Sequence, residues 1–442
     1  MIYLIFGFGA SGKGALSLIY NKRDTFYLFD DSIQVRTSAL NAYLTTPNIF
    51  VLSSIGREVL SEVDTIVLSP GISIKDKRLN SFKGQIISEL ELAYKRAKGK
   101  IIAITGTNGK TTTTRLISHI LTTAGKRNVA CGNIGLPLSQ VAKTRAIKVC
   151  EVSSFQLEGA KTFAPNIACL LNITPDHIDR HGSMREYKRI KYSILSHMGK
   201  KSVAILSATL KSPKSFQGNL LYFGGSKKSS SYIKNGFYCV SIGKEHRVCP
   251  VDKQKYLGLF NHENIMCAIL VAKLFSIKDK YISKALSTFA MSHHRLELVY
   301  QDANLSVYDD SKATNIDATI RAVKAFDSQE SISLILGGSD KDTDFDLLFV
   351  SLPQNVKTIY ATGQVRDKIK SSFERSSFSA TLKTFPTLKD ATFDAIQTTP
   401  KGIVLLSPAC ASFDEFSSYK DRGEKFKQYV CLALNSKGDA AL

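Results

Sequence analysis

The sequence predicts an α/β protein built on parallel sheets, and three observations carry this prediction. Short apolar runs of four or five residues, bounded by Gly, Pro or Ser, recur along the chain. Such runs are typical of strands buried on both faces of a parallel sheet. Longer amphipathic stretches alternate with them, which indicates crossover helices. At about 150 residues per domain, the 442 residues indicate about three domains.

The expected elements follow this alternation. Strands are expected at 2–6, 65–68, 101–104, 168–171, 333–336 and 403–406, and helices at 111–123 and 264–275. A charged stretch at 94–100 precedes a new strand, and a helical pattern ends near 291–294. We therefore place domain boundaries near residues 93 and 292, which gives domains of residues 1–92, 93–292 and 293–442.

The composition is that of an ordinary globular chain, with 43% hydrophobic and 22% charged residues. It excludes collagen-like, coiled-coil and wholly disordered proteins. The formal net charge of +21 fits nucleic acid, a membrane surface or polyanionic small molecules such as nucleotides. Residues 200–255 contain eleven Lys or Arg and two acidic residues, and we expect this segment to be a solvated excursion of the central domain.

The eight cysteines lie far apart and include no C-x-x-C pair. This usage predicts reduced, mostly buried thiols in a cytosolic protein. The apolar N-terminus lacks a basic region and breaks at Gly7, so it indicates a buried strand rather than a signal peptide. No stretch approaches the ~20 apolar residues of a membrane-spanning helix. We expect a soluble, cytoplasmic protein.

A glycine loop in the middle of the chain predicts a phosphate site. Residues 101–112 have the pattern of a strand, a turn with Gly106 and Gly109, and a helix start. The glycines let backbone N–H groups converge on a phosphate, and the helix directs its positive end there. Lys110 supplies a mobile positive charge, and the Thr111 hydroxyl can ligate Mg²⁺. The loop departs from G-x-x-x-x-G-K-[ST], and a mere turn with a helix cap is the alternative.

A second glycine loop, at residues 7–12, follows the first expected strand. Asp30 and Asp31 close the next strand, 18 and 19 residues beyond Gly12. This spacing matches the dinucleotide fingerprint, in which glycines admit a pyrophosphate and an acid holds a ribose or its neighbour. The ligand could be NAD or a nucleotide-sugar diphosphate, and the loop does not distinguish them.

Polar side chains gather after several of the expected strands. Glu151 ends one of them, and the next is followed by the polar segment 172–181, which contains His177. Thr111 and Glu151 could share one Mg²⁺ that bridges phosphate oxygens, because hard cations prefer oxygen ligands. Asn264 could simply cap a helix. Further polar loops at 308–315, 337–341 and 407–414 also follow strands, where α/β sites form.

Seven motifs together carry a resemblance to the Mur ligase family over essentially the whole chain. They are G-T-N-G-K-T at 106–111, C-G-N-I-G-L-P at 131–137, E-V-S-S-F-Q-L-E at 151–158, N-I-T-P-D-H-I-D-R at 172–180, D-D-S-K-A-T-N at 309–315, L-G-G-S-D-K at 336–341 and S-P-A-C-A-S-F-D at 407–414. The first is shared with folylpolyglutamate synthases. The blocks at 153–158, 310–315 and 407–412 resemble the members that add D-glutamate.

The resemblance implies three domains: a Rossmann-like N-terminal uridine-nucleotide domain, a central P-loop ATPase-like domain with a parallel sheet, and a Rossmann-like C-terminal domain that brings the amino acid. It implies that ATP phosphorylates the carboxylate of UDP-N-acetylmuramoyl-L-alanine and that the amine of D-glutamate then displaces the phosphate, in cytoplasmic peptidoglycan precursor synthesis. ATP is a co-substrate, two Mg²⁺ ions are expected, and a monomer without nucleic acid or a membrane span is expected.

The alternatives are another amide ligase of the superfamily, a basic nucleic-acid-binding protein and an NAD oxidoreductase. A nucleic-acid-binding protein leaves the blocks at 309–315 and 407–414 unexplained. An NAD oxidoreductase would not need Lys110.

The resemblance also implies roles for individual residues. The ATP-binding residues are Gly106, Thr107, Asn108, Gly109, Lys110, Thr111, Thr112, Asn261, Asn264, Arg295 and Asp310. Thr111 and Glu151 would hold one Mg²⁺, and His177 and a carbamylated Lys191 the second; Lys110, His177 and Lys191 would be catalytic. The substrate-binding residues are Ser11, Asp30, Asp31 and Gly71 for the uridine diphosphate, Asn133 for the muramoyl group, and Lys312, Thr314, Lys341, Ser412 and Phe413 for D-glutamate. From the sequence alone, Lys191 has the pattern of an ordinary helix-surface lysine. Phe260 stands where histidine is expected, and Ser32 where some relatives carry arginine.

Overall fold

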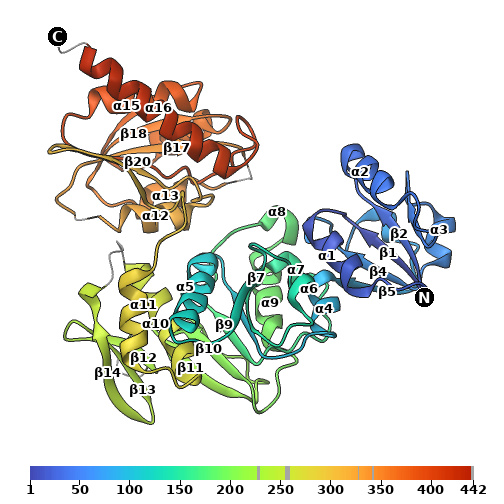
Figure 1. Cartoon of the computed structure of the whole chain (residues 1–442). Helices are drawn as coiled ribbons and strands as arrows, with labels where there is room; N and C mark the ends of the chain where they lie inside the picture. Colours follow the sequence, from blue (N-terminus) through green and yellow to red (C-terminus); the bar gives the residue numbers. More distant parts are fainter. Residues whose placement is uncertain (226–228, 254–258, 327, 341–342, 440–442) are drawn as a thin grey trace. The chain divides into compact units, whose positions relative to one another are not determined.

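The computed structural model describes residues 1–225, 229–253, 259–326, 328–340 and 343–439. In these residues the strands form three sheets, coloured blue, cyan to yellow-green, and orange to red in Figure 1. Most strand pairs are parallel, so the predicted α/β class is confirmed. The predicted strands at 2–6 and 65–68 match observed strands residue for residue, and those at 101–104, 168–171, 333–336 and 403–406 match within one residue at each end.

The first sheet has the strand order β3-β2-β1-β4-β5, and all of its pairs are parallel. Its strands β1 and β4 are buried on both faces, which is why the runs Ile2–Phe6 and Thr65–Leu68 show no alternation. The elements are β1 (Ile2–Phe6), α1 (Ala10–Ile19), β2 (Thr25–Phe29), α2 (Ile33–Tyr43), β3 (Ile49–Val51), α3 (Arg57–Glu62), β4 (Thr65–Leu68), the 3₁₀ turn Lys77–Leu79, β5 (Gln85–Ser88) and α4 (Glu89–Tyr94).

The second sheet has the order β14-β13-β12-β11-β10-β9-β6-β8-β7 in the described residues. Strands β6 to β11 pair in parallel, and β12 to β14 pair antiparallel. The elements are β6 (Ile101–Thr105), α5 (Lys110–Thr123), β7 (Asn128–Gly132), α6 (Leu138–Val141), β8 (Ile147–Glu151), α7 (Ser154–Glu158), β9 (Ile167–Leu170), α8 (Ile178–His181), α9 (Met184–Tyr192), β10 (Val203–Ser207), β11 (Asn219–Phe223), β12 (Ser231–Lys234), β13 (Phe237–Ile242), β14 (Lys244–Pro250), α10 (Leu259–Leu274) and α11 (Asp279–Thr288), with 3₁₀ turns at Ser193–Leu195 and Val251–Lys253.

The central sheet changes two predictions. In its described residues, 200–225 and 229–253, the basic segment is not an excursion, because β10 to β14 continue the sheet while Lys211, Lys214 and Lys244 remain exposed. The interpretation of Asn264 as a helix cap is also wrong. It lies inside α10, which begins at Leu259, and its side chain is buried.

The third sheet has the order β15-β16-β20-β17-β18-β19, and only the β15–β16 pair is antiparallel among its described strands. The elements are β15 (Glu297–Gln301), β16 (Leu305–Asp309), α12 (Ile316–Val323), β17 (Ile332–Gly337), α13 (Asp346–Ser351), β18 (Val356–Thr362), α14 (Arg366–Arg375), β19 (Thr381–Thr384), α15 (Leu388–Thr398), β20 (Gly402–Leu406) and α16 (Tyr419–Asp439).

The chain divides into two compact units. Unit 1 comprises residues 1–173, 184–254 and 263–289, and unit 2 comprises residues 174–183, 255–262 and 290–442. Within unit 1 the first two sheets share a core, and Gly14 of α1 approaches α6 so closely that an added Cβ would lie 2.4 Å from Ser139 Oγ. The predicted boundaries near 93 and 292 stay predictions.

The thiols behave as the cysteine spacing predicts. All eight cysteines are free, seven of them are buried, and Cys431 on α16 is exposed. In the part of the chain that the structure describes, no helix combines the length and the apolar character that crossing a bilayer requires.

Candidate functional site

The glycine loop between β6 and α5 builds an anion site. Gly109 precedes the first residue of α5 with φ +86°, and a Cβ there would lie 2.5 Å from Asn264 Oδ1. Only glycine fits this left-handed position against the buried α10. Because Gly109 offers no capping side chain, the first N–H groups of α5 are directed at the loop, where the helix dipole favours an anion. Thr111 and Thr112 lie buried in this first turn.

Asn172, which follows β9, holds the loop in shape. Its Oδ1 accepts the Asn108 N–H at 2.8 Å, its Nδ2 donates to Asn108 O at 3.0 Å, and its own carbonyl accepts the Thr107 N–H at 3.0 Å. Lys110 Nζ donates to the carbonyl oxygens of Gly106 and Thr107, both at 2.8 Å. The loop and its lysine are therefore ordered before any phosphate binds, which lowers the entropy cost of binding.

Glu151 supplies the carboxylate of this site. It ends β8 and is 2% exposed. Asn133 Nδ2 donates to Glu151 Oε1 at 3.0 Å, whereas Glu151 Oε2 is buried without a hydrogen-bond partner. A buried carboxylate oxygen without a partner needs an explanation, and a hard cation is one that its chemistry suits. The residues present therefore fit a Mg²⁺ site.

Lys191 is not the surface lysine that the sequence alone indicates. It lies on α9 with 1% exposure, and Nζ donates to Gly106 O at 2.9 Å and lies 4.7 Å from the centre of the Tyr187 ring. Tyr187 in turn contacts the loop, with 3.0 Å between its hydroxyl and Thr107 Oγ1. Tyr187, Ile190, Lys191 and Ile194 form one buried stripe at helical spacing. Lys191 therefore lies in α9 but contacts the phosphate loop.

A second group of predicted residues gathers in unit 2, at the ends of β16 and β20. Asp310 is buried, and its carboxylate accepts hydrogen bonds from Ser407 Oγ at 2.9 Å and from the Leu296 N–H at 3.3 Å. Arg295, next to Leu296, adds an electrostatic contact to this carboxyl. Burial raises the pKa of Asp310 to about 7, and the Ser407 hydrogen bond only partly opposes this.

We expect Asp310→Asn to change the pH dependence of unfolding. The folded carboxyl titrates near 7 and the unfolded one near 3.8, so the folded chain binds the extra proton between these values. The contribution of this group to stability is complete below pH 4 and is lost as pH rises through 7, on the order of 4 kcal/mol. Urea unfolding at pH 5 and pH 8, followed by a probe placed in unit 2, should show the variant gaining stability relative to the wild type at the higher pH. Parallel curves would contradict the assignment.

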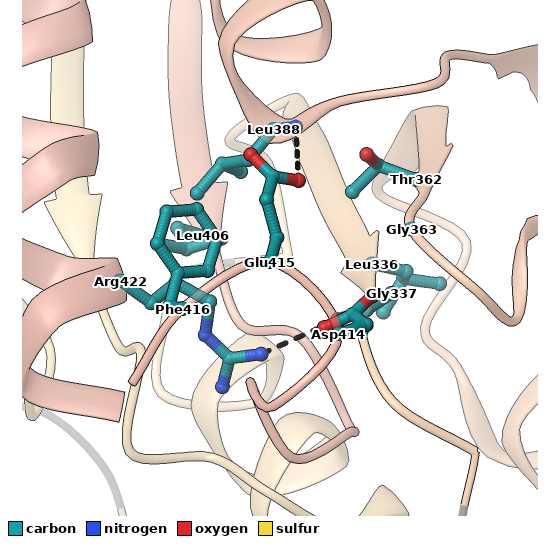
Figure 2. Close-up of a pocket in the computed structure, with 11 residues that line it drawn as sticks. Leu336, Gly337, Thr362, Gly363, Leu388, Leu406, Asp414, Glu415, Phe416 and Arg422 are labelled. Atoms are coloured by element: carbon teal, nitrogen blue, oxygen red, sulfur yellow. Dashed lines mark hydrogen bonds between the residues drawn. The ribbon is translucent and has the colours of Figure 1, made fainter. Parts of the chain in front are cut away.

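Arg422 of α16 connects three loops of unit 2. It is 2% exposed, and its guanidinium donates to Ser311 Oγ and O, Ala411 O, Cys410 O and Gly337 O at 2.8–3.4 Å. Figure 2 shows it among the residues that line a pocket at the ends of β17, β18 and β20. The pocket is lined by Leu336, Gly337, Gly338, Thr362, Gly363, Leu388, Leu406, Asp414, Glu415, Phe416 and Arg422. Desolvation raises the pKa of Glu415, whose carboxylate accepts the Leu388 N–H at 3.2 Å.

The predicted amino-acid-binding residues are only partly gathered. Lys312 Nζ lies 3.0 Å from the Tyr419 hydroxyl and 4.7 Å from the centre of its ring. Ser412 is buried, Thr314 is half-buried, and Phe413 is 71% exposed. Lys341 and the Asn261 side chain lie outside the described residues.

The N-terminal loop has the expected acid at its edge. Asp30 Oδ2 accepts the Phe8 N–H of the glycine loop at 2.7 Å. Asp31 is paired with Arg78, whose hydrogen bond lowers the pKa of that carboxyl. Ser11 is half-buried at the start of α1, and Gly71 is exposed after β4. Asp30 therefore supports the shape of the glycine loop. Asp31 and Arg78 form an ion pair near it.

Four residues that the sequence did not single out support these sites, namely Asn172, Tyr187, Tyr419 and Arg422. Arg422 could have been found, because it shares a buried helical stripe with Phe426, Val430 and Ala433. A charged residue at such a position needs several partners. Tyr419 gives no comparable signal.

The comparisons with known proteins agree with the motifs. The family model of the Mur ligase middle domain matches residues 104–272, and that of the Mur ligase, glutamate ligase domain matches residues 294–410. A UDP-N-acetylmuramoylalanine--D-glutamate ligase of Lachnoclostridium phytofermentans is 35% identical over 97% of each chain. One of Aquifex aeolicus is 37% identical over 97% of this chain and 98% of the relative.

Solved structures share the fold at low identity. The MurF ligase of Thermotoga maritima, solved in complex with ADP, has a TM-score of 0.60 at 15% identity and covers 96% of this chain and 98% of that one. The UDP-N-acetylmuramate-alanine ligase of the same organism has a TM-score of 0.59 at 18% identity, over 99% of both chains. With curated relatives above 30% identity over nearly the full length, the chain belongs to the Mur ligase family, in the branch of the UDP-N-acetylmuramoylalanine--D-glutamate ligases.

Proposed function

We propose that this chain is an ATP-dependent ligase that joins D-glutamate to UDP-N-acetylmuramoyl-L-alanine in the cytoplasmic synthesis of peptidoglycan precursors. The observation that carries the proposal is the ordered loop of residues 106–110 in the same unit as the unpartnered carboxylate oxygen of Glu151. The name of the curated relatives supports the assignment of D-glutamate and UDP-N-acetylmuramoyl-L-alanine as substrates. Eight free cysteines support a reducing compartment, and a monomer is the proposed state.

The backbone N–H groups of the loop and of the first turn of α5 would bind the ATP phosphates. Lys110 would leave its carbonyl partners to follow the transferred phosphoryl group, and Asn264 would keep the loop in register. Thr111 and Glu151 would hold one Mg²⁺, and His177 and a carbamylated Lys191 a second. Bound there, Mg²⁺ would neutralise the repulsion between the triphosphate and the substrate carboxylate.

The remaining predicted residues would orient the two other substrates. Asn133, held by Glu151, would bind the muramoyl group, and the loop of residues 7–12 with Asp30, Asp31 and Gly71 would meet the uridine diphosphate. Lys312, Thr314, Lys341, Ser412 and Phe413 would receive D-glutamate, since two cations suit a dicarboxylate. Arg295 and Asp310 would serve the nucleotide. Water must be excluded from this site because it would hydrolyse an acyl phosphate.

The proposal predicts a defined product. The protein mixed with ATP, Mg²⁺, D-glutamate and UDP-N-acetylmuramoyl-L-alanine should release phosphate and yield the amide, identified by mass. L-alanine and L-lysine in place of D-glutamate serve as controls and should give no product. If L-lysine or L-alanine is joined and D-glutamate is not, the chain is a different amide ligase. If ATP is not consumed with both co-substrates present, the proposed reaction is wrong.

A further inference from the structure

The loop that carries His177 belongs, by its packing, to unit 2. It lies between β9 and α9, which both belong to unit 1, yet residues 174–183 cluster with residues 290–442. The residue His177 has a left-handed backbone with φ +54°, an uncommon conformation for a residue with a side chain. Asp176 Oδ1 accepts the His177 N–H at 3.0 Å, which supports this turn. Contacts with other residues of unit 2 therefore hold this loop.

Two hydrogen bonds to the start of α12 provide this hold. Asn315 Nδ2 donates to Asp176 Oδ2 at 3.2 Å, and Thr174 Oγ1 donates to Asp317 Oδ2 at 3.2 Å. Both partners are themselves fixed. Asn315 Oδ1 caps α12 by accepting the Ala318 N–H at 2.9 Å, and Arg321 Nε donates to Asp317 Oδ2 at 2.7 Å. We call these two contacts the α12 clamp.

The clamp lies next in sequence to residues of two proposed sites. Asn315 directly follows Thr314 and lies three residues after Lys312, and both of these are proposed to receive D-glutamate. Asp176 directly precedes His177, the proposed ligand of the second Mg²⁺. A rearrangement of the 312–315 loop would therefore act on the Asp176 carboxylate and on the backbone turn that it supports.

We infer that Asn315 and Asp317 are positioning residues, which hold the turn of His177 in place and link it to the amino-acid-binding loop. This inference rests on the proposed function. Neither residue needs to touch a substrate. Their effect passes through Asp176 and Thr174 to the orientation of His177.

The first variant removes the donor of the Asn315–Asp176 hydrogen bond. Asn315→Asp keeps an equally good helix cap, but it removes the donor and places a carboxylate opposite Asp176. We expect about a tenfold fall in kcat and about a tenfold rise in the half-saturating Mg²⁺ concentration, because hydrogen bonds to charged groups are worth this much. The KM for UDP-N-acetylmuramoyl-L-alanine should not change. Hydrogen exchange of the peptide covering residues 174–183 should become faster, and this readout does not depend on activity.

The double variant Asn315→Asp/Asp176→Asn restores the contact, because the new amide can donate to the new carboxylate while its oxygen still accepts the His177 N–H. Asp176→Asn alone sets two amide donors against each other and should also fail, so a poorly folded Asn315→Asp does not end the test. Asn304→Asp adds the same charge at an exposed turn of unit 2 and should behave as the wild type.

Recovery of both readouts in the double variant supports the clamp. Unchanged exchange in both single variants, or a double variant no better than they are, overturns it. If the wild type forms no amide, the proposed reaction fails, and the exchange measurement still decides on the clamp.

Discussion

Replacing Lys110 by alanine is expected to lower kcat for phosphate release by about 10²–10³-fold, the loss typical when one preorganised electrostatic donor is removed. Lys110 brings a positive charge to the phosphate loop, where its ammonium group donates to the Gly106 and Thr107 carbonyls. Steady-state phosphate release with all three substrates measures the effect. The fold should survive, because the removed side chain only contacts the loop, which Asn172 holds independently.

Lys126→Ala is the matched control for this experiment. Lys126 is exposed just beyond the other end of α5. Its replacement by alanine removes the same unit of charge from a protein of net charge +21. Any general loss of attraction for anionic substrates appears equally in both variants. Wild-type activity in Lys110→Ala, or an equal loss in both variants, would remove Lys110 from the proposed mechanism.

The second large effect is expected for Arg422→Ala, which should lower the free energy of unfolding of unit 2 by about 3–5 kcal/mol. The substitution removes the guanidinium donor from the buried Ser311 and Cys410 carbonyls, whereas the Ala411 carbonyl still accepts the Ser339 N–H at 2.9 Å. Because the chain has two compact units, a single melting temperature is a poor measure. Hydrogen exchange of peptides from β16, β17 and β20 reports the stability of unit 2 directly.

Arg375→Ala serves as the comparison. Arg375 pairs with Asp346 at 2.8 Å, but both side chains are more than half exposed, so its loss should cost less than about 1 kcal/mol. Similar exchange in the two variants would show that the buried hydrogen bonds of Arg422 contribute little. Arg422→Ala should also weaken the site, because Ser311 and Ala411 adjoin Lys312 and Ser412.

The sequence predicted the parts of the fold that depend on local pattern. Buried parallel strands leave continuous apolar runs, and the glycine loop needs Gly109 because of its left-handed backbone and the contact with Asn264. The residues that meet these requirements are consecutive in the sequence, so a local pattern is enough to find them.

Contacts between distant segments were harder to predict. Lys191 passed for a surface residue because a lysine is usually exposed, although its helical stripe places it against Gly106, 85 residues away. Asn172 could not be distinguished from the other polar residues of its segment, because its contact with the loop depends on β9 lying beside β6 in the sheet. The continuation of the sheet through the basic segment also depends on pairing, as between β10 and β9, which no local charge pattern encodes.

The contrast between seven buried thiols and an exposed Cys431 has a practical consequence. A maleimide fluorophore should label the native protein at α16 alone, without prior mutagenesis. A second dye, attached to a cysteine introduced on the surface of unit 1, would then report by energy transfer how the distance between the two units responds to each substrate.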